Sequence, residues 1–290
     1  MTDIVTKNGK RTISSVSYVS PSGTVPVNMQ RMAEGYPSVN DMLGRSWFQL
    51  AHRGGSRDYS EHSEQAYTNA YVAGYGAFEV AVATSSDGTL FLMHDATLLR
   101  TSNLDQSARA TPWATIKDLK IIKPTTAVAG ATDRSYLTLD KYFDLFGNHG
   151  VHFIDTKYLY PADRVTLRNM IVAKGLTSRV LGKVVLGDSS TYANAATLAK
   201  EWQDAGIKVA GLMYAINKDD FPSLVGTYDV LGMEYTADQT VWDALKNAGG
   251  SKKIIGHIAP NISSVTTAKT KGASGCICSS PMTTPVLTGG

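Results

Sequence analysis

The chain has 290 residues, 43% of them hydrophobic, and a formal net charge of +3 from 28 basic and 25 acidic residues. This length and apolar content suffice for a large buried core in one or two domains. The basic residues are spread along the chain, whereas a nucleic-acid interface needs them on one face, so we expect no nucleic-acid partner. No apolar stretch approaches the roughly 20 residues of a membrane span, so we predict none.

Residues 1–45 are rich in serine, threonine and valine, without a sustained apolar period. A run around Val16–Val19 predicts one strand, and three prolines punctuate the rest of the segment. The first 15 residues lack the apolar middle of a signal peptide, so any export would use another route and the location of the protein stays open. Two interpretations remain: a flexible or loosely docked extension, or an arm that attaches the protein to an assembly.

From Trp47 onward, short apolar runs alternate with amphipathic stretches that have helical periodicity. Eight runs read as strands, namely Phe48–His52, Phe78–Val82, Val151–Asp155, Val180–Leu186, Lys208–Tyr214, Asp229–Glu234, Lys253–Ile258 and Gly275–Ser279. The helix-like stretches are Leu139–Phe146, Ala162–Lys174, Tyr192–Ala205, Asp238–Ala248 and Val265–Lys271. Buried strands alternating with helices predict a parallel sheet covered on both faces.

Eight strands over about 240 residues match a (β/α)₈ TIM barrel, which we place at residues 46–290. A doubly wound open sheet is the second interpretation, but no G-x-G-x-x-G follows the first run, which weakens its dinucleotide-binding form. Asp87-Gly88 lies between two apolar runs and predicts a small hairpin insertion after the second strand, which would carry His94 over the barrel mouth. Cys276 and Cys278 are too close for a disulfide, and we expect both in the core.

Four polar residues fall at or just beyond the carboxyl ends of predicted strands: His52, Glu79, Asp155 and Lys157. Side chains at these ends face the active site of a barrel enzyme. Imidazoles gathered beside carboxylates are typical of proton transfer next to a bound cation. The spacing therefore predicts a catalytic site at this end of the barrel.

Several short motifs follow one another in a characteristic order, namely His52-Arg53-Gly54, Glu61, Glu79, Asp87-Gly88, His94-Asp95 and Leu98-Leu99-Arg100-Thr101. This order resembles that of the glycerophosphodiester phosphodiesterase family. Phe153–Lys157 is similar to the acidic-x-Lys strand of the family, and Gly272–Pro281 is similar to its closing strand. The resemblance implies a metal-dependent phosphodiesterase on a (β/α)₈ barrel.

The resemblance also implies roles for the motif residues. His52 and His94 would be the general acid and base, and the sequence does not decide which histidine has which role. Glu61, Glu79 and Asp155 would hold a divalent cation, Mg²⁺ or Ca²⁺, because carboxylate oxygens suit hard ions. The phosphate oxygens would be neutralised by Arg53 and Lys157.

The sequence departs from the family pattern at three places. The family usually has Glu-x-Asp on its second strand, where this chain has Ala81 in place of the aspartate, so one metal ligand is absent and metal affinity should fall. Asp155 stands where the family usually has glutamate, and His62 replaces an asparagine. Glu234, at the end of the sixth strand, is a candidate replacement ligand or a salt-bridge partner.

The remaining histidines have simpler interpretations. His62 has two interpretations, a place near the barrel mouth or exposure at the start of a helix. We expect His149 and His152 to be structural because they flank the amino-terminal side of the third strand. His257 ends the seventh strand and is a candidate for the mouth.

Three functions follow from these observations. The first is hydrolysis of small or polymeric glycerol-type phosphodiesters, teichoic acid included. The second is a catalytically weak barrel that binds such polymers, and the third is a phospholipase D-like phosphotransfer that gives a cyclic phosphate. The degenerate metal motif and polar extension are similar to bacteriophage and actinobacterial versions of the domain, which suggests a virion component that assembles through residues 1–45.

Overall fold

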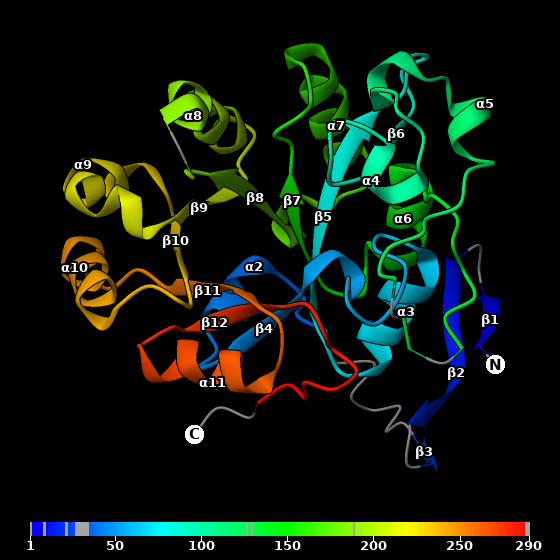
Figure 1. Cartoon of the computed structure of the whole chain (residues 1–290), viewed down its shortest axis with the longest axis horizontal. Coiled ribbons are helices and arrows are strands. Elements are labelled where there is room, and N and C mark those ends of the chain that lie inside the picture. The colour runs from blue at the N-terminus through cyan, green and yellow to red at the C-terminus, as the bar shows by residue number, and fades with distance from the viewer. Residues whose placement is uncertain are drawn as a thin grey trace.

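Eight parallel strands close into a barrel in the computed structural model (Figure 1). The model describes the backbone of residues 2–7, 10–20, 23–26, 35–125, 127–128, 130–187 and 189–287, and side chains from residue 35 onward except those of 189–193. The barrel strands are β4 (Phe48–Ala51), β5 (Ala77–Thr84), β7 (Val151–Asp155), β8 (Val180–Val185), β9 (Lys208–Met213), β10 (Val230–Glu234), β11 (Ile254–Ala259) and β12 (Gly275–Cys278). Pairing of β4 with both β12 and β5 closes the ring. The (β/α)₈ barrel is confirmed, and the open sheet is excluded.

Helices follow most strands and form the outer layer (Figure 1). They are α3 (Glu64–Val72), α6 (Leu139–Phe146), α7 (Pro161–Ala173), α8 (Ser189–Asp204), α9 (Phe221–Leu224), α10 (Gln239–Gly249) and α11 (Ile262–Thr270). Side chains of Ser63, Thr138 and Asn261 accept from backbone N–H groups at the starts of α3, α6 and α11, as N-cap residues do. No helix in the described parts of the chain has the length and apolarity to cross a membrane.

The barrel interior is apolar at its amino-terminal end and polar at its carboxyl end. Apolar side chains from all eight barrel strands and from the short helix α2 (Val39–Leu43) form one buried cluster there, which includes Met42, Phe48, Phe153, Leu212 and Ile277. Residues facing the interior alternate with outward residues along each strand. The next inward positions toward the carboxyl ends are therefore those that bear the polar groups described below.

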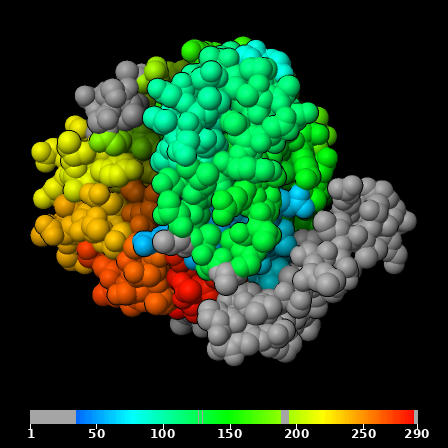
Figure 2. Space-filling view, turned by 45° about the vertical axis from the view of Figure 1, so that its right-hand side comes forward, coloured from blue at the N-terminus to red at the C-terminus, as the bar shows by residue number. Residues whose placement is uncertain are grey.

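The predicted hairpin after the second barrel strand is confirmed. Strand β6 (Leu90–Leu92) pairs antiparallel with the end of β5, across the Asp87-Gly88 turn. The insertion continues through α4 (Leu99–Ser102), the 3₁₀ turn η2 (Ala108–Ala110) and α5 (Trp113–Ile116). It has its own small core around Phe91, Ile116 and Tyr136, and it forms a thick cyan-to-green ridge on one face of the molecule (Figure 2).

The amino-terminal segment contains three antiparallel strands in the order β1-β2-β3, namely β1 (Thr2–Lys7), β2 (Lys10–Ser20) and β3 (Gly23–Pro26). The strand expected around Val16–Val19 lies within β2. The division into residues 1–45 and 46–290 stays a prediction. Helix α2, which falls before that boundary, buries Val39 and Met42 at the amino-terminal end of the barrel interior.

Candidate active site

His52 is positioned by a tight left-handed turn directly after β4. The 3₁₀ turn η1 (His52–Gly54) has Arg53 at φ 54° and Gly54 at φ 76°. A Cβ on Gly54 would lie 3.0 Å from the Cβ of Ala66 on α3. Glycine at this position therefore allows both the positive φ and the close approach of α3.

The His52 ring is held on one side and unbonded on the other. Its Nδ1 lies 2.9 Å from both the Ser279 and the Ser56 hydroxyl oxygens. Its Nε2 faces the Glu79 Oε2 at 3.4 Å, and both of these buried atoms lack a hydrogen-bond partner. Because the hydroxyls can donate to Nδ1 and a carboxylate can only accept, the neutral ring is best satisfied with its proton on Nε2.

His94 is held in the opposite tautomer on the segment that follows β6. Its Nδ1 donates to the Asp95 carboxylate at 2.6 Å, and its Nε2 accepts from the Lys157 ammonium at 2.7 Å. The lone pair for proton transfer is therefore on Nε2. Lys157 also reaches Asp155 at 3.5 Å, which connects the His94 side of the site to the barrel interior.

A buried lysine, Lys183, lies between the two interior carboxylates. Its Nζ donates to Glu79 Oε1 at 2.5 Å and forms an ion pair with Asp155 Oδ2 at 3.0 Å. The strand register explains the second contact, because Ala81, Asp155 and Lys183 are level on three neighbouring strands. Contacts thus run continuously from His52 through Glu79, Lys183, Asp155 and Lys157 to His94.

Glu61 is fixed by two arginines. Arg100 donates to its two carboxylate oxygens at 3.0 and 2.6 Å, and Arg53 donates to one of them at 3.2 Å. Arg100 also pairs with Asp95, the partner of His94. The cluster therefore links the His52 turn to the insertion that carries His94.

Burial and charge shift the pKa values of the site in consistent directions. Desolvation lowers the pKa of His52 to about 3, against the opposing effect of Glu79. Desolvation also lowers the pKa of His94 and of Lys157. For Glu61, burial opposes ionisation, but the two arginines outweigh it and lower the pKa to about 2. Burial thus favours the neutral, proton-accepting form of both imidazoles, and Glu79 is the group that favours the protonated form of His52.

Lys183 keeps its charge despite being buried. Desolvation lowers its pKa, but Asp155 and Glu79 outweigh that effect, and the pKa is raised overall. The same ion pairs lower the pKa of both carboxyl groups against the cost of burial. The centre of the site is therefore an ionised carboxylate–ammonium–carboxylate triad.

Other histidines differ in part from expectation. Of the two interpretations of His62, exposure is wrong: the ring is buried at 1% exposure and donates to the Tyr67 hydroxyl, which donates to the backbone oxygen of Glu79. His257 is buried and bonds the Met213 backbone oxygen through Nε2. His152 is structural as predicted, since it is buried between the Tyr142 hydroxyl and the Gly147 carbonyl.

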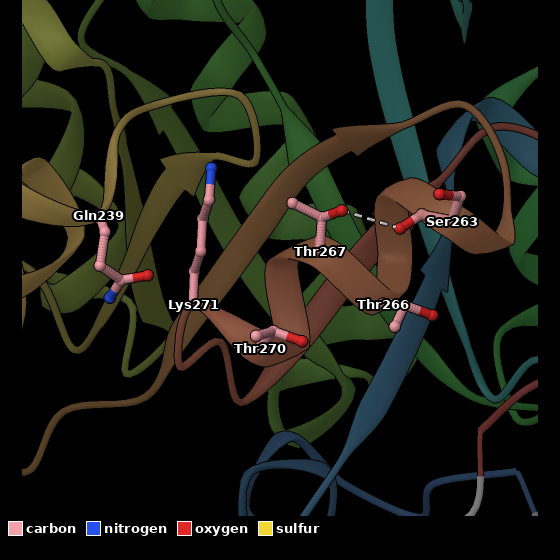
Figure 3. Close-up of a pocket in the computed structure, with 6 residues that line it drawn as sticks. All are labelled: Gln239, Ser263, Thr266, Thr267, Thr270 and Lys271. Carbon is pink, nitrogen blue, oxygen red and sulfur yellow. Dashed lines mark hydrogen bonds between the residues drawn. The ribbon is translucent and has the colours of Figure 1, made fainter.

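Two cavities outside this hydrogen-bonded centre differ in chemistry. One, of about 410 Å³, is lined by Lys157, Lys183 and Arg164 among others and adjoins the site. The other, of about 450 Å³, lies over α11 and the start of α10, where its lining is hydroxyl-rich and its one charged group, Lys271, bonds backbone carbonyls (Figure 3). The first is therefore lined by three cations that also pair with carboxylates of the chain, whereas the second has no charged group besides Lys271.

The residues present fit a divalent cation poorly. Among the described side chains, no group of three or more histidine, cysteine or acidic residues is arranged to hold a metal ion. A metal would need oxygens at 2.0–2.6 Å, and the Glu79 and Asp155 oxygens already bond the Lys183 ammonium. A divalent ion about 4 Å from that ammonium would meet a repulsion of about 8 kcal/mol at an effective dielectric constant of about 20.

The fold and this geometry define a (β/α)₈ barrel with two imidazoles and equal numbers of paired acidic and basic side chains at its carboxyl end. Comparison with known proteins agrees with the motif order. A model of the glycerophosphoryl diester phosphodiesterase family matches residues 52–159, so this part of the chain is similar to that family.

Individual proteins show the same similarity. A glycerophosphodiester phosphodiesterase of Bacillus subtilis is 29% identical over 142 residues, which are 46% of this chain and 47% of that protein, so the match spans about half the length of the curated relative. Solved structures are similar in fold. That of an Agrobacterium tumefaciens glycerophosphodiester phosphodiesterase has a TM-score of 0.61 at 20% identity, over 81% of this chain and 97% of that one. An Oleispira antarctica phosphodiesterase in complex with the product sn-glycerol-3-phosphate has a TM-score of 0.62 at 19% identity, over 81% and 94%.

Sequence reasoning missed Lys183, Arg100 as the partner of Glu61, and the serines beside His52. A lysine inside the apolar run Val180–Leu186 was the available signal for Lys183, because an interior lysine needs a carboxylate partner. The identity of that partner depends on strand order and register, which the run itself does not contain.

Proposed function

We propose that the protein is a phosphodiesterase that cleaves glycerophosphodiester-type substrates by acid–base catalysis with His52 and His94. The observation that carries this proposal is the continuous set of contacts between the two imidazoles, whose Nε2 atoms differ in protonation. The family-model match over residues 52–159 and the bacterial relative support the same reaction class. The solved relative with bound sn-glycerol-3-phosphate supports a glycerol phosphate product.

The hydrogen bonds suggest which histidine plays which role. His94 presents a lone pair on Nε2 and is the general base that takes the proton of the attacking hydroxyl. His52 turns its Nε2 toward the Glu79 carboxylate, which favours the imidazolium form, and in that form it is the general acid that gives the Nε2 proton to the leaving alkoxide and returns to the neutral ring. One proton is thus removed and one supplied as the new P–O bond forms and the old one breaks.

The anionic phosphate is neutralised by cations of the chain. Lys157 Nζ bonds His94 Nε2 at 2.7 Å and Asp155 Oδ2 at 3.5 Å. A phosphate oxygen that accepted from Lys157 in place of His94 would free the His94 Nε2 lone pair for catalysis. Arg53 is tethered by Glu61 at the entrance to the His52 turn. Such preorganised charge is a large part of phosphoryl-transfer catalysis.

Metal dependence through Glu61, Glu79 and Asp155 remains a prediction of the resemblance. We derive no step through a metal, because each of these carboxylates is already paired with a lysine or arginine. Polymeric substrates such as teichoic acid, a binding-only role, and a virion assembly that uses residues 1–45 also remain predictions.

The test is turnover of glycerophosphoglycerol followed by ³¹P NMR, which separates hydrolysis from a cyclic phosphate product. We expect glycerol phosphate from the wild type, and kcat lower by a factor of about 10² to 10⁴ in His52→Ala and in His94→Ala. His149→Gln is the matched control, because that histidine lies at the other end of the barrel, against Tyr71. Turnover that survives both alanine substitutions unchanged would refute the proposal, as would tight binding without turnover by the wild type.

A further inference from the structure

Two departures from the family pattern meet at one level of the barrel. Ala81 brings a methyl group to the strand position where the resemblance implies a metal-binding aspartate, and its register partner is Asp155. Lys183, the register partner of Asp155 on the other side, brings an ammonium group to the same level. An anionic ligand is therefore missing at the place where an additional positive charge is present.

The ammonium occupies the oxygens that a metal would use. It contacts one oxygen of Glu79 at 2.5 Å and one of Asp155 at 3.0 Å, and the Lys183 side chain is only 4% exposed. The third proposed ligand, Glu61, has both oxygens bonded by Arg100. Every carboxylate of the implied metal set thus has a cationic partner within the chain.

The charges of the site also balance without a metal. Glu61, Glu79, Asp95 and Asp155 supply four negative charges, and Arg53, Arg100, Lys157 and Lys183 supply four positive charges. Lys183 and Lys157 line the same cavity beside the site. A phosphodiester entering there meets ammonium groups and neutralised carboxylates.

We infer that Lys183 is a built-in replacement for the divalent cation, which makes this a metal-independent member of the family. Lys183 is a positioning residue: it neutralises Glu79 and Asp155, holds Glu79 beside His52, and lets the anionic substrate approach. This inference rests on the proposed function for its kinetic consequence, but its metal-binding consequence is independent of that function.

The first measurement is metal binding by the purified wild-type chain. Isothermal titration with Mg²⁺, Ca²⁺ and Mn²⁺ should show no binding up to millimolar concentration, and chelation followed by metal addition should change turnover less than twofold. One bound equivalent at micromolar concentration would overturn the inference while leaving the phosphodiesterase proposal intact. A metal-free protein that turns over no diester would refute the proposed function alone.

The second measurement uses Lys183→Met, with Lys200→Met as the matched control, since Lys200 forms an exposed ion pair on α8. In Lys183→Met we expect KM to rise at least tenfold, divalent-ion binding to appear, and Mg²⁺ or Ca²⁺ to lower KM again. A merely structural lysine would give no such metal stimulation. Should Lys183→Met fail to fold, Ala81→Asp/Lys183→Met restores a carboxylate-rich cation site and should fold with Ca²⁺ and not without it. An unchanged KM without metal binding in either folded variant would overturn the inference.

Discussion

Replacement of Glu61 tests whether this residue has a structural role, as the partner of Arg53 and Arg100, or is a metal ligand. Replacing Glu61 with glutamine keeps the volume and one acceptor oxygen, but it turns an amide N–H toward a guanidinium group. Three charge-assisted hydrogen bonds are weakened, two from Arg100 and one from Arg53. Breaking a buried ion pair by removing one partner costs about 3–5 kcal/mol.

The expected loss is smaller than that range because the cluster is partly solvated. Glu61 is 5% exposed, but the Arg100 side chain is 39% exposed and keeps Asp95 as a partner. Discounting for this screening, we expect Glu61→Gln to lower the free energy of unfolding by about 2–3 kcal/mol. Urea denaturation at pH 7 with an unchanged m-value would measure it.

A matched control lies on the outer surface. Glu201 on α8 accepts two bonds from Arg164 and one from Arg168, the same arginine–glutamate–arginine arrangement at 23% exposure. We expect Glu201→Gln to cost less than about 1 kcal/mol and to leave turnover unchanged. Equal losses of unfolding free energy in the two variants would refute a structural role of Glu61 as the partner of the two arginines. So would strong stabilisation by millimolar Mg²⁺ or Ca²⁺ in the wild type but not in Glu61→Gln.

Two further predictions concern pH. Burial lowers the pKa of His152 to about 4 in the folded state from 6.5, so the unfolded chain binds the proton first as pH falls. The contribution of neutral His152 to the free energy of unfolding is complete above pH 6.5, declines as pH falls through 6.5, and levels off below about pH 4. Between these pH values, the free energy of unfolding of His152→Gln should depend less steeply on pH. Lys157→Met removes a cation that lowers the pKa of His94, so the acid limb of the kcat/KM profile should move to higher pH, while in Lys200→Met it should not move. If the acid limb does not move in Lys157→Met, the titration of His94 is not what sets it.

The barrel could be predicted from sequence because its strands are short, apolar and regularly spaced. All eight predicted runs begin within one residue of the observed strand, and β7 (Val151–Asp155) matches at both ends. The insertion after β6 could not be predicted beyond its hairpin, since Leu99–Ser102 and Trp113–Ile116 are single helical turns without an apolar period. Such short turns depend on tertiary packing more than on local pattern.

The sequence predicted most residues of the candidate site, but not which of them form ion pairs and hydrogen bonds with one another. His52, Asp155 and Lys157 lie at or just beyond the ends of β4 and β7, whereas Glu79 is the third residue of β5 and lies deeper in the barrel, level with Phe153. The burial of His62 was missed because a histidine in a loop after a turn usually lies in solvent, whereas this one bridges Arg53 O and Tyr67. Partners of this kind are fixed by three-dimensional register and burial.

The substitutions at positions 81 and 183 are best understood together. A barrel with Ala81 but an apolar residue at 183 would leave the Glu79 and Asp155 carboxylates facing one another across a dry interior, which is a costly arrangement without a cation. A barrel with an aspartate at 81 and Lys183 would hold three carboxylates around one ammonium and repel an anionic substrate. Only the pair present here gives neutral charge at the level of Asp155 while leaving Glu79 Oε2 free to face His52. The two positions should therefore be coupled in a double-mutant cycle, with Ala81→Asp tolerated better beside Lys183→Met than alone in metal-containing buffer.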